Sequence, residues 1–489
     1  MLAPDLQSDP HAIGDMEAKG ICVLETLLAS WLFGLPDTVG LDAWGSGCPW
    51  VRGQAMTQHK HLKARIRARM KKTGEAYSTA RRQVKKNVPA TTSDSLACHR
   101  TGQIAATTAL GILLAHHGIH NPVTKKPFSE AMLFGLAGGI GIGTFQFVYE
   151  KADFASFFIA GRHQWWDDLA YFKTVCERFG LQTVTKSASG ARPAEKNLRE
   201  LLKNGPVIAW VDAASLPHRA MPSEYAGGGY HVITIYRIDD EAKTALIGDR
   251  SEKPIAIGLK ELTLARQRIK KFKTQLLGLA GDQPRLDLPE LIRSGLAACH
   301  IGLVQQRMSN FTLEGLKAWG NRLYGSKDKD GWDRVFTPGC RLWSGLTSIY
   351  EYIDRYSAGG LCRPIFAEFL KEAADVLDDM DLRILATRYA TLGQLWSDLA
   401  NAALPEGVPA FKKARKLITQ RKALLAKGAK AEEVGAVWEE LGALRKEAKE
   451  CFPLSAEQSA ALRQDLQQRV FNLYEVEGAA HASMGDWVK

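Results

Sequence analysis

Cysteine is sparse in this chain, long apolar runs are absent, and no motif for a metal or a nucleotide is present. The eight cysteines stand singly along 489 residues, which argues against a disulfide scaffold or a zinc site and suits a reducing, cytoplasmic compartment. No run of about 18 uncharged apolar residues predicts a membrane span. Without HExxH, paired Cys/His spacing or a phosphate-binding loop, the sequence predicts neither a metal nor an organic cofactor.

The length and the apolar content predict more than one folded core. With 489 residues, 45% of them hydrophobic, the chain is long enough for two or three domains. Strand patterns almost vanish after about Asp287, and helical periods dominate from there on. We therefore predict an α+β fold, with an antiparallel-sheet domain over residues 91–280 and an all-α domain over residues 287–489.

Two N-terminal segments differ from the rest of the chain. Residues 1–55 begin acidic and continue with Trp, Gly and Pro, so we expect a weakly ordered extension ahead of a start codon at Met56. Residues 56–90 hold eleven Lys or Arg residues against Glu75 alone, so this basic helical arm supplies most of the net charge of +11. The arm is expected to dock an acidic partner, such as a carrier protein, or to be a solvated tail. Sequence-specific nucleic-acid binding is not supported, because Tyr77 is the arm's only aromatic residue.

Three residues follow one another in the order that papain-type thiol enzymes use: Cys98, His231 and Asp249. A cysteine becomes nucleophilic when an imidazolium or a helix N-terminus stabilises its thiolate. The Ala- and Leu-rich stretch from His99 to His117 predicts a helix with Cys98 in its first turn, at the positive end of the helix dipole.

The other two residues are predicted to lie on paired strands. The sequence around His231 and before Asp249 alternates and branches as strands do, and Asp239 to Glu241 provides the turn between them. Each residue alone has an ordinary structural explanation, as a buried thiol, a satisfied histidine or a turn cap. The combination and its order predict a nucleophile, a general base and an orienting acid.

Several further residues are candidates for substrate binding. The loop from Asp212 to Gly229 is long enough for a mobile lid over the site. His163 is a weaker functional candidate. Arg363 is predicted to reach the cleft and hold a carboxylate or phosphate as a bidentate clamp, with a helix-start salt bridge as its structural alternative. The charged helical hairpin of Ala410 to Lys449, by contrast, is expected to turn its charges to solvent.

Some of these segments resemble the N-terminal-domain family of butirosin biosynthesis protein H. The most specific likeness is the run SEAMLFGLAGG, with Cys98-His99, Gly205-Pro206-Val207 and the strands of His231 and Asp249 in support. Gly359 to Pro364 and the Trp-rich helices beyond look like the uncharacterised helical domain that often follows it. The resemblance covers about residues 95 to 480.

The resemblance implies a papain-like fold and an acyltransferase that moves an acyl group from a carrier-protein thioester to an amine. Carried over by position, Cys98 is the nucleophile, His231 the general base and Asp249 the orienting acid, while Gly139 and Gly141 help to wall the substrate pocket. Papain-like enzymes commonly place an oxyanion-hole Gln shortly before the cysteine, and this chain has none there. The second oxyanion donor is therefore unassigned, beside the backbone N–H of the cysteine.

Two alternatives stay open at this point. A cysteine peptidase or amidase that acts on a peptide uses the same first half of the reaction, because transfer and hydrolysis differ only in the acceptor. A non-catalytic binding protein keeps the fold, leaves Cys98 inert and docks its partner through the basic arm. Replacement of Cys98 separates the enzymes from the binding protein.

Overall fold

The computed structural model describes residues 97–149, 154–280, 284 and 286–488. The predicted N-terminal extension, the start at Met56 and the basic arm lie outside these residues. His99 and all described residues after it belong to one compact unit, whereas Cys98 belongs to the other. The fold below is that of the unit from His99 onward.

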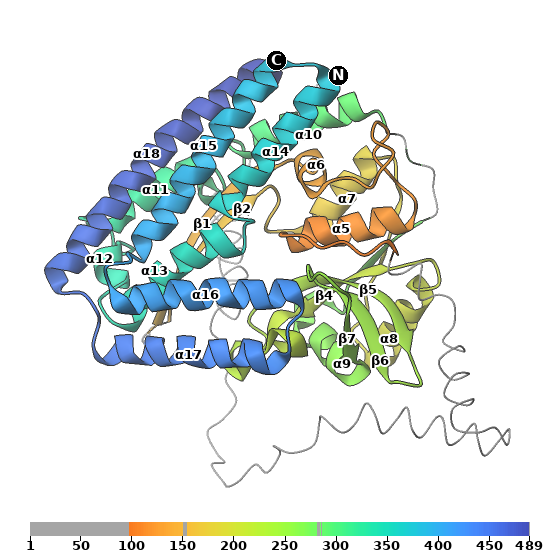
Figure 1. The fold of residues 1–489 in the computed structure, drawn as a ribbon, viewed down its shortest axis with the longest axis horizontal. Coiled ribbons are helices and arrows are strands. Elements are labelled where there is room, and N and C mark those ends of the chain that lie inside the picture. The colour runs from red at the N-terminus through yellow and green to blue at the C-terminus, as the bar shows by residue number, and fades with distance from the viewer. Residues whose placement is uncertain (1–96, 150–153, 281–283, 285, 489) are drawn as a thin grey trace, which may run out of the picture. The chain divides into compact units, whose positions relative to one another are not determined.

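A six-stranded antiparallel sheet is the centre of the N-terminal part. Figure 1 labels its strands β4 to β7. Its strand order is β3-β8-β4-β5-β6-β7, and every neighbouring pair is antiparallel. β5 and β6 form the predicted hairpin. The strands are β3 (Thr183–Lys186), β4 (Val207–Asp212), β5 (Tyr230–Asp239), β6 (Thr244–Gly248), β7 (Ile255–Gly258) and β8 (Leu276–Leu279).

The sheet is covered on both faces, and its central strand β4 is apolar up to Asp212. Along β4, which is buried over its whole length, Ile208 and Trp210 enter one core cluster, and Val207, Ala209 and Val211 enter another. This alternation follows from the two-residue period of a strand. The covering helices of the N-terminal part are α5 (Ala105–His116), α6 (Glu130–Leu136), α7 (Asp168–Arg178), α8 (Ala191–Leu201) and α9 (Leu259–Arg268).

The helix predicted from His99 to His117 begins later than expected, and this part of the prediction is wrong. α5 starts at Ala105, so Cys98 precedes the helix rather than lying in its first turn. The intervening residues make other contacts: the backbone N–H groups of Gln103 and Ile104 donate to the carboxylate of Glu130, at 2.9–3.0 Å. A carboxylate from another element thus satisfies donors just ahead of the helix.

A separate antiparallel hairpin, β1 (Ile140–Tyr149) and β2 (Phe154–Arg162), joins the sheet region to the helical part and was not predicted. The glycines before β1 serve close packing and a turn. Gly139 has φ +62°, and a Cβ there would come within 2.5 Å of Phe366. On the helical side, the Phe157 ring stacks on Trp319 with centroids 4.8 Å apart.

The C-terminal part is helical, so the predicted α+β class with antiparallel sheet and helical C-terminal region is confirmed. α10 begins directly after Asp287, which caps it by accepting from the Glu290 N–H. A π-helical turn follows α13. The predicted helical hairpin is formed by α16 and α17, and it turns at Gly428. The helices are α10 (Leu288–Gly302), α11 (Leu313–Leu323), α12 (Trp332–Val335), α13 (Cys340–Tyr350), α14 (Arg363–Leu377), α15 (Met380–Ala403), α16 (Pro409–Lys427), α17 (Ala431–Glu450) and α18 (Ala456–Val488).

One hydrophobic core runs through both parts: the cluster that holds Leu110 of α5 also holds Trp396 of α15. Among the described residues, no helix combines the length and the apolar character that a membrane crossing requires.

Candidate active site

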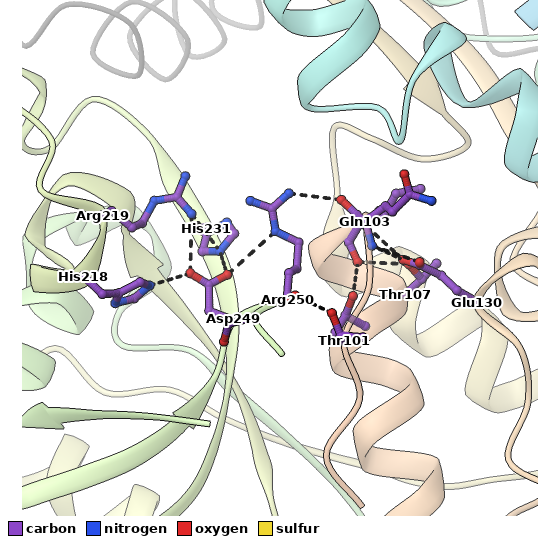
Figure 2. Close-up of polar contacts among 12 residues, drawn as sticks. Thr101, Gln103, Thr107, Glu130, His218, Arg219, His231, Asp249 and Arg250 are labelled. Atoms are coloured by element: carbon purple, nitrogen blue, oxygen red, sulfur yellow. Dashed lines mark hydrogen bonds and ion pairs between the residues drawn. The ribbon is translucent and has the colours of Figure 1, made fainter. Parts of the chain in front are cut away.

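The predicted pair of His231 and Asp249 is formed at the end of the β5–β6 hairpin, as Figure 2 shows. His231 is the second residue of β5, opposite Val211 of β4, and Asp249 directly follows β6. The His231 Nε2 atom lies 2.5 Å from Asp249 Oδ1. Because Nε2 faces the carboxylate, Nδ1 is the nitrogen left to exchange a proton with a reacting group. The structure thus supplies the geometry of a base and its orienting acid, while their catalytic role stays a prediction.

Three cationic or basic side chains surround the Asp249 carboxylate. The loop between β4 and β5 brings His218 Nε2 to 2.8 Å and Arg219 Nη1 to 3.5 Å from Oδ2. Arg250 Nε lies 3.9 Å from Oδ1. Arg219 Nη1 also lies 3.3 Å from His231 Nε2, so the loop contacts both members of the pair. Sequence reasoning placed His218 and Arg219 on the lid loop but did not predict their contact with Asp249, because that contact depends on how the loop folds back.

Burial and charge fix the protonation states of the pair. Burial lowers the pKa of His231 to about 4, with Asp249 opposing the shift and Arg219 adding to it. Burial alone would raise the pKa of Asp249, but His231, the hydrogen bond from His218 and the charge of Arg219 hold it well below its usual range. At neutral pH the site therefore holds a neutral imidazole beside a carboxylate. Such an imidazole acts as a general base and does not stabilise a thiolate by its own charge.

The low pKa of buried histidine predicts acid destabilisation. Burial lowers the pKa of His163 to about 4 as well. For both side chains the pKa in the folded chain lies below the value of about 6.5 in an unfolded chain. The free energy of unfolding is therefore highest above pH 6.5 and decreases as the pH falls toward 4. The expected loss at pH 5 is roughly 2 kcal/mol for each histidine. Thermal unfolding at pH 7 and pH 5 measures it, with His163→Gln and His231→Gln each expected to reduce the pH dependence. If both variants lose stability between pH 7 and pH 5 as the parent chain does, the two histidines are not the cause of the acid destabilisation.

The segment ahead of α5 is tied to the end of β6. Thr101 Oγ1 donates to the Arg250 carbonyl at 2.8 Å, and Arg250 Nη1 donates to the Gln103 carbonyl at 3.1 Å. Figure 2 shows Arg250 between Asp249 on one side and Gln103 on the other. Arg250 is in the left-handed region with φ 56°, which a non-glycine residue adopts rarely and mostly where its surroundings require it. These contacts fix the start of α5 beside the His231–Asp249 pair.

A cavity of about 260 Å³ opens beside His231, and we name it the His231 cavity. The start of α5 contributes Ala105 and Ala106 to its lining, and Arg250 contributes charge. Apolar surface comes from aromatic side chains of β2 and of the segments near it: Phe158, Trp165, Trp166 and Tyr352. An apolar cavity with a few convergent polar groups is typical of a site for a small molecule or an acyl chain.

A second polar pair lines the same cavity. Arg162 at the end of β2 forms an ion pair with Asp168 at the start of α7, and its guanidinium lies 4.2 Å from the centre of the Tyr171 ring. Burial raises the pKa of Asp168, although Arg162 opposes the shift. Within the described part of the chain no cluster of three or more His, Cys, Asp or Glu side chains could hold a metal ion.

The position of the predicted nucleophile relative to His231 and Asp249 stays a prediction, because the residues belong to different compact units. Cys98 is 4% exposed and belongs to the other compact unit. The next residue, His99, is anchored near the site: its Nδ1 lies 2.7 Å from the Tyr236 hydroxyl and its Nε2 lies 2.9 Å from the Ser251 carbonyl. The thiol that lines the His231 cavity among the described residues is Cys362, and burial raises its pKa to about 12. A thiol of that pKa is not a nucleophile near neutral pH.

The predicted substrate-binding glycines, Gly139 and Gly141, and His163 are not among the residues that line the His231 cavity. A Cβ on Gly141 would come within 2.6 Å of the Arg162 carbonyl, so close packing of β1 on β2 accounts for this glycine. His163 packs under Gly138 and Gly302, where an added Cβ would meet its ring at 2.5 and 2.6 Å. Both residues therefore have structural explanations in this fold.

Arg363 does not form the predicted substrate clamp. Its side chain is fully buried at the first position of α14, and its Nε donates to Glu477 Oε1 at 2.6 Å. Trp396 Nε1 donates to the same oxygen at 2.8 Å. The structural alternative, a salt bridge at a helix start, is what the structure contains, because Glu477 from α18 meets the guanidinium inside the core.

Comparison with known families identifies both parts of the chain. Residues 105–250 match the family described as Butirosin biosynthesis protein H, N-terminal, and residues 260–433 match a Domain of unknown function (DUF4872). The first match spans the described sheet strands up to β6, His231 and Asp249, and it begins at the first residue of α5. A search of curated proteins found no match.

Proposed function

We propose that this chain, whose residues 105–250 match the butirosin biosynthesis protein H N-terminal family of acyltransferase-like biosynthetic proteins, transfers an acyl group from a thioester to an amine. The observation that carries the proposal is the His231–Asp249 pair, whose His231 lines an apolar cavity at the start of α5. The fold is proposed to be papain-like, and the protein to work in the cytoplasm on a carrier-bound or peptide-derived acyl donor.

In the proposed cycle Cys98 supplies the nucleophile. Nδ1 of neutral His231 takes the thiol proton, the sulfur attacks the thioester carbonyl, and the carbon–sulfur bond to the leaving group breaks as His231 returns the proton to the departing thiol. The acyl group is then on Cys98. The acceptor amine attacks this second thioester, His231 accepts its proton, and the Cys98 thiol is restored. Asp249 holds the imidazole throughout.

One feature supports transfer over hydrolysis. The pair is buried, with the His231 side chain 11% exposed and the Asp249 side chain 3% exposed, and a site that excludes water favours an amine acceptor. Cys98 is proposed as the nucleophile because it precedes His231 and Asp249 in the order that papain-type thiol enzymes use.

A non-catalytic binding protein is the second candidate, and one observation favours it. The helix start that lines the His231 cavity carries Ala105 and Ala106, neither of which has a nucleophilic side chain. In such a protein the cavity would bind an acyl or aromatic ligand without turnover, and the basic arm would dock the partner.

Alkylation by iodoacetamide distinguishes the acyltransferase from the binding protein. The reaction is followed at each cysteine by peptide mass spectrometry across a pH series. Cys98 is expected to react at least about 10-fold faster than exposed Cys451, and to lose this advantage in His231→Ala, because His231 is the base that removes its proton. His163→Ala is the matched control and should leave Cys98 reactive. If Cys98 reacts no faster than Cys451, or ignores the loss of His231, the binding protein is the better assignment.

A further inference from the structure

A second cavity adjoins the first and has a different chemistry. It also measures about 260 Å³, and we name it the Arg421 cavity. It lies between the loop from β4 to β5 and the helices α13, α16 and α17, and it shares Ala213, Arg219 and Tyr356 with the His231 cavity. A molecule long enough to occupy both cavities would pass Arg219, the residue that also contacts His231 and Asp249.

Arg421 lines this cavity, and its buried guanidinium is held in place by its neighbours. The sequence assigned it to a solvated helix face, but the structure buries it to 1% exposure. Its guanidinium lies 3.8 Å from the centre of the Trp438 ring, and Nη2 donates to Glu351 Oε1 at 2.7 Å. The Nη1 atom is buried and has no hydrogen-bond partner in the described part of the chain. A buried guanidinium N–H without a partner is costly, and a ligand oxygen would satisfy it.

The other charges of the lining point to the same kind of ligand. Arg219 and Arg445 also line the cavity, against Glu224 and Glu351, and Glu351 is already paired with Arg421. The Arg219 Nε atom is buried without a partner as well. The unsatisfied buried groups of this lining are thus N–H donors, so the ligand must bring acceptor oxygens. Glu351 stands on the π-helical turn after α13, a local distortion that often marks functional sites.

The loop that carries Arg219 is hydrogen-bonded to α17, which also lines the cavity. Trp438 Nε1 donates to the Arg219 carbonyl at 3.2 Å, and the Tyr225 ring lies 5.6 Å from the Trp438 ring. α17 therefore positions both arginines: it packs on the Arg421 guanidinium and holds the backbone of Arg219.

We propose that the Arg421 cavity binds an acidic group, a carboxylate or a phosphate, carried by the molecule whose acyl end occupies the His231 cavity. Arg421 and Arg219 donate to its oxygens, and the planar fork of arginine suits both groups. The identity of that molecule as a substrate rests on the proposed function, whereas the acid-binding site does not. A carboxylate would belong to the acyl or acceptor molecule, and a phosphate to the arm of a carrier.

Calorimetric titration of the full chain at constant ionic strength, with inorganic phosphate in one arm and acetate in the other, tests the site. Saturable binding is expected for at least one probe, and the stronger probe identifies the acid. Arg421→Met keeps the aliphatic packing on Trp438 but removes the donors, so it should weaken binding at least 10-fold. Arg388→Met, which changes an exposed arginine bonded to Ser483, should leave binding unchanged.

The outcomes separate this proposal from the proposed function. If neither probe saturates, or if Arg421→Met binds as the parent chain does, the acid site is refuted. If circular dichroism shows that Arg421→Met does not fold, Arg219→Met, which removes the other proposed donor, decides by the same criterion. If the parent chain binds the probe but transfers no acyl group from thioester donors, the site is upheld and the proposed function is refuted.

Discussion

Replacing Cys98 with Ala is expected to lower acyl transfer by at least about 10⁴-fold, because loss of the nucleophile from a catalytic triad leaves only binding and oxyanion stabilisation. Turnover is measured with a thioester donor and an amine acceptor, and the acyl-enzyme is sought by intact-protein mass spectrometry. The parent chain should gain the mass of the acyl group on Cys98, and the variant should gain none.

Two variants make this result specific. Cys451→Ala removes an exposed cysteine and should leave turnover unchanged. Cys98→Ser keeps the shape of the side chain but weakens the nucleophile, so it should also be strongly impaired. If Cys98→Ala keeps full turnover while His231→Ala loses it, the covalent step is wrong and His231 acts directly on the acceptor amine. If neither change lowers turnover, the reaction does not use this site.

The pairing of His231 with Asp249 was predictable from sequence because it depends on local order. Alternating strands around a short turn bring two residues of one hairpin side by side, whatever the rest of the chain does. The two residues sit at the second position of β5 and directly after β6, and their side chains meet as expected. The two-residue period of the strands and the position of the turn were sufficient to predict this pair.

The start of α5 was not predictable in the same way. Its boundary depends on Glu130, which lies 26 or 27 residues after the N–H groups that it accepts from. Threonines, serine and aspartate ahead of Cys98 are good local caps, yet the structure uses a carboxylate from α6. A boundary set by a distant partner leaves no local pattern, and the position of Cys98 relative to the helix was wrong for that reason.

The burial of two arginines, Arg421 and Arg363, was also not predictable from the sequence. Arg421 stands in a charged helix whose pattern is typical of a solvated face, and Arg363 follows a glycine-rich loop that is typical of a binding site. Both are buried because another helix supplies an acceptor or an aromatic ring: Glu477 for Arg363, and Trp438 for Arg421. Helix-to-helix pairing of this kind cannot be read from either helix alone.

The Arg363–Glu477 pair gives the largest expected effect on stability. Both side chains are fully buried, and the Arg363 Nη1 atom also donates to the Leu361 carbonyl at 2.7 Å. Because Trp396 shares the Glu477 carboxylate, the pair connects α14, α15 and α18. Glu477→Leu leaves a buried guanidinium without its counter-charge, so it should lower the free energy of unfolding by about 3–5 kcal/mol. Urea unfolding followed by tryptophan fluorescence measures the loss.

The double variant decides whether charge or shape causes this loss. Arg363→Met together with Glu477→Leu removes both charges and keeps apolar volume, so it should regain most of the stability, as buried ion pairs are often replaceable by apolar side chains. Asp465→Asn, which breaks an exposed pair with Arg469 on α18, should cost no more than about 1 kcal/mol. If the double variant is no more stable than Glu477→Leu alone, packing around Trp396 rather than the unpaired charge determines the stability of the three helices.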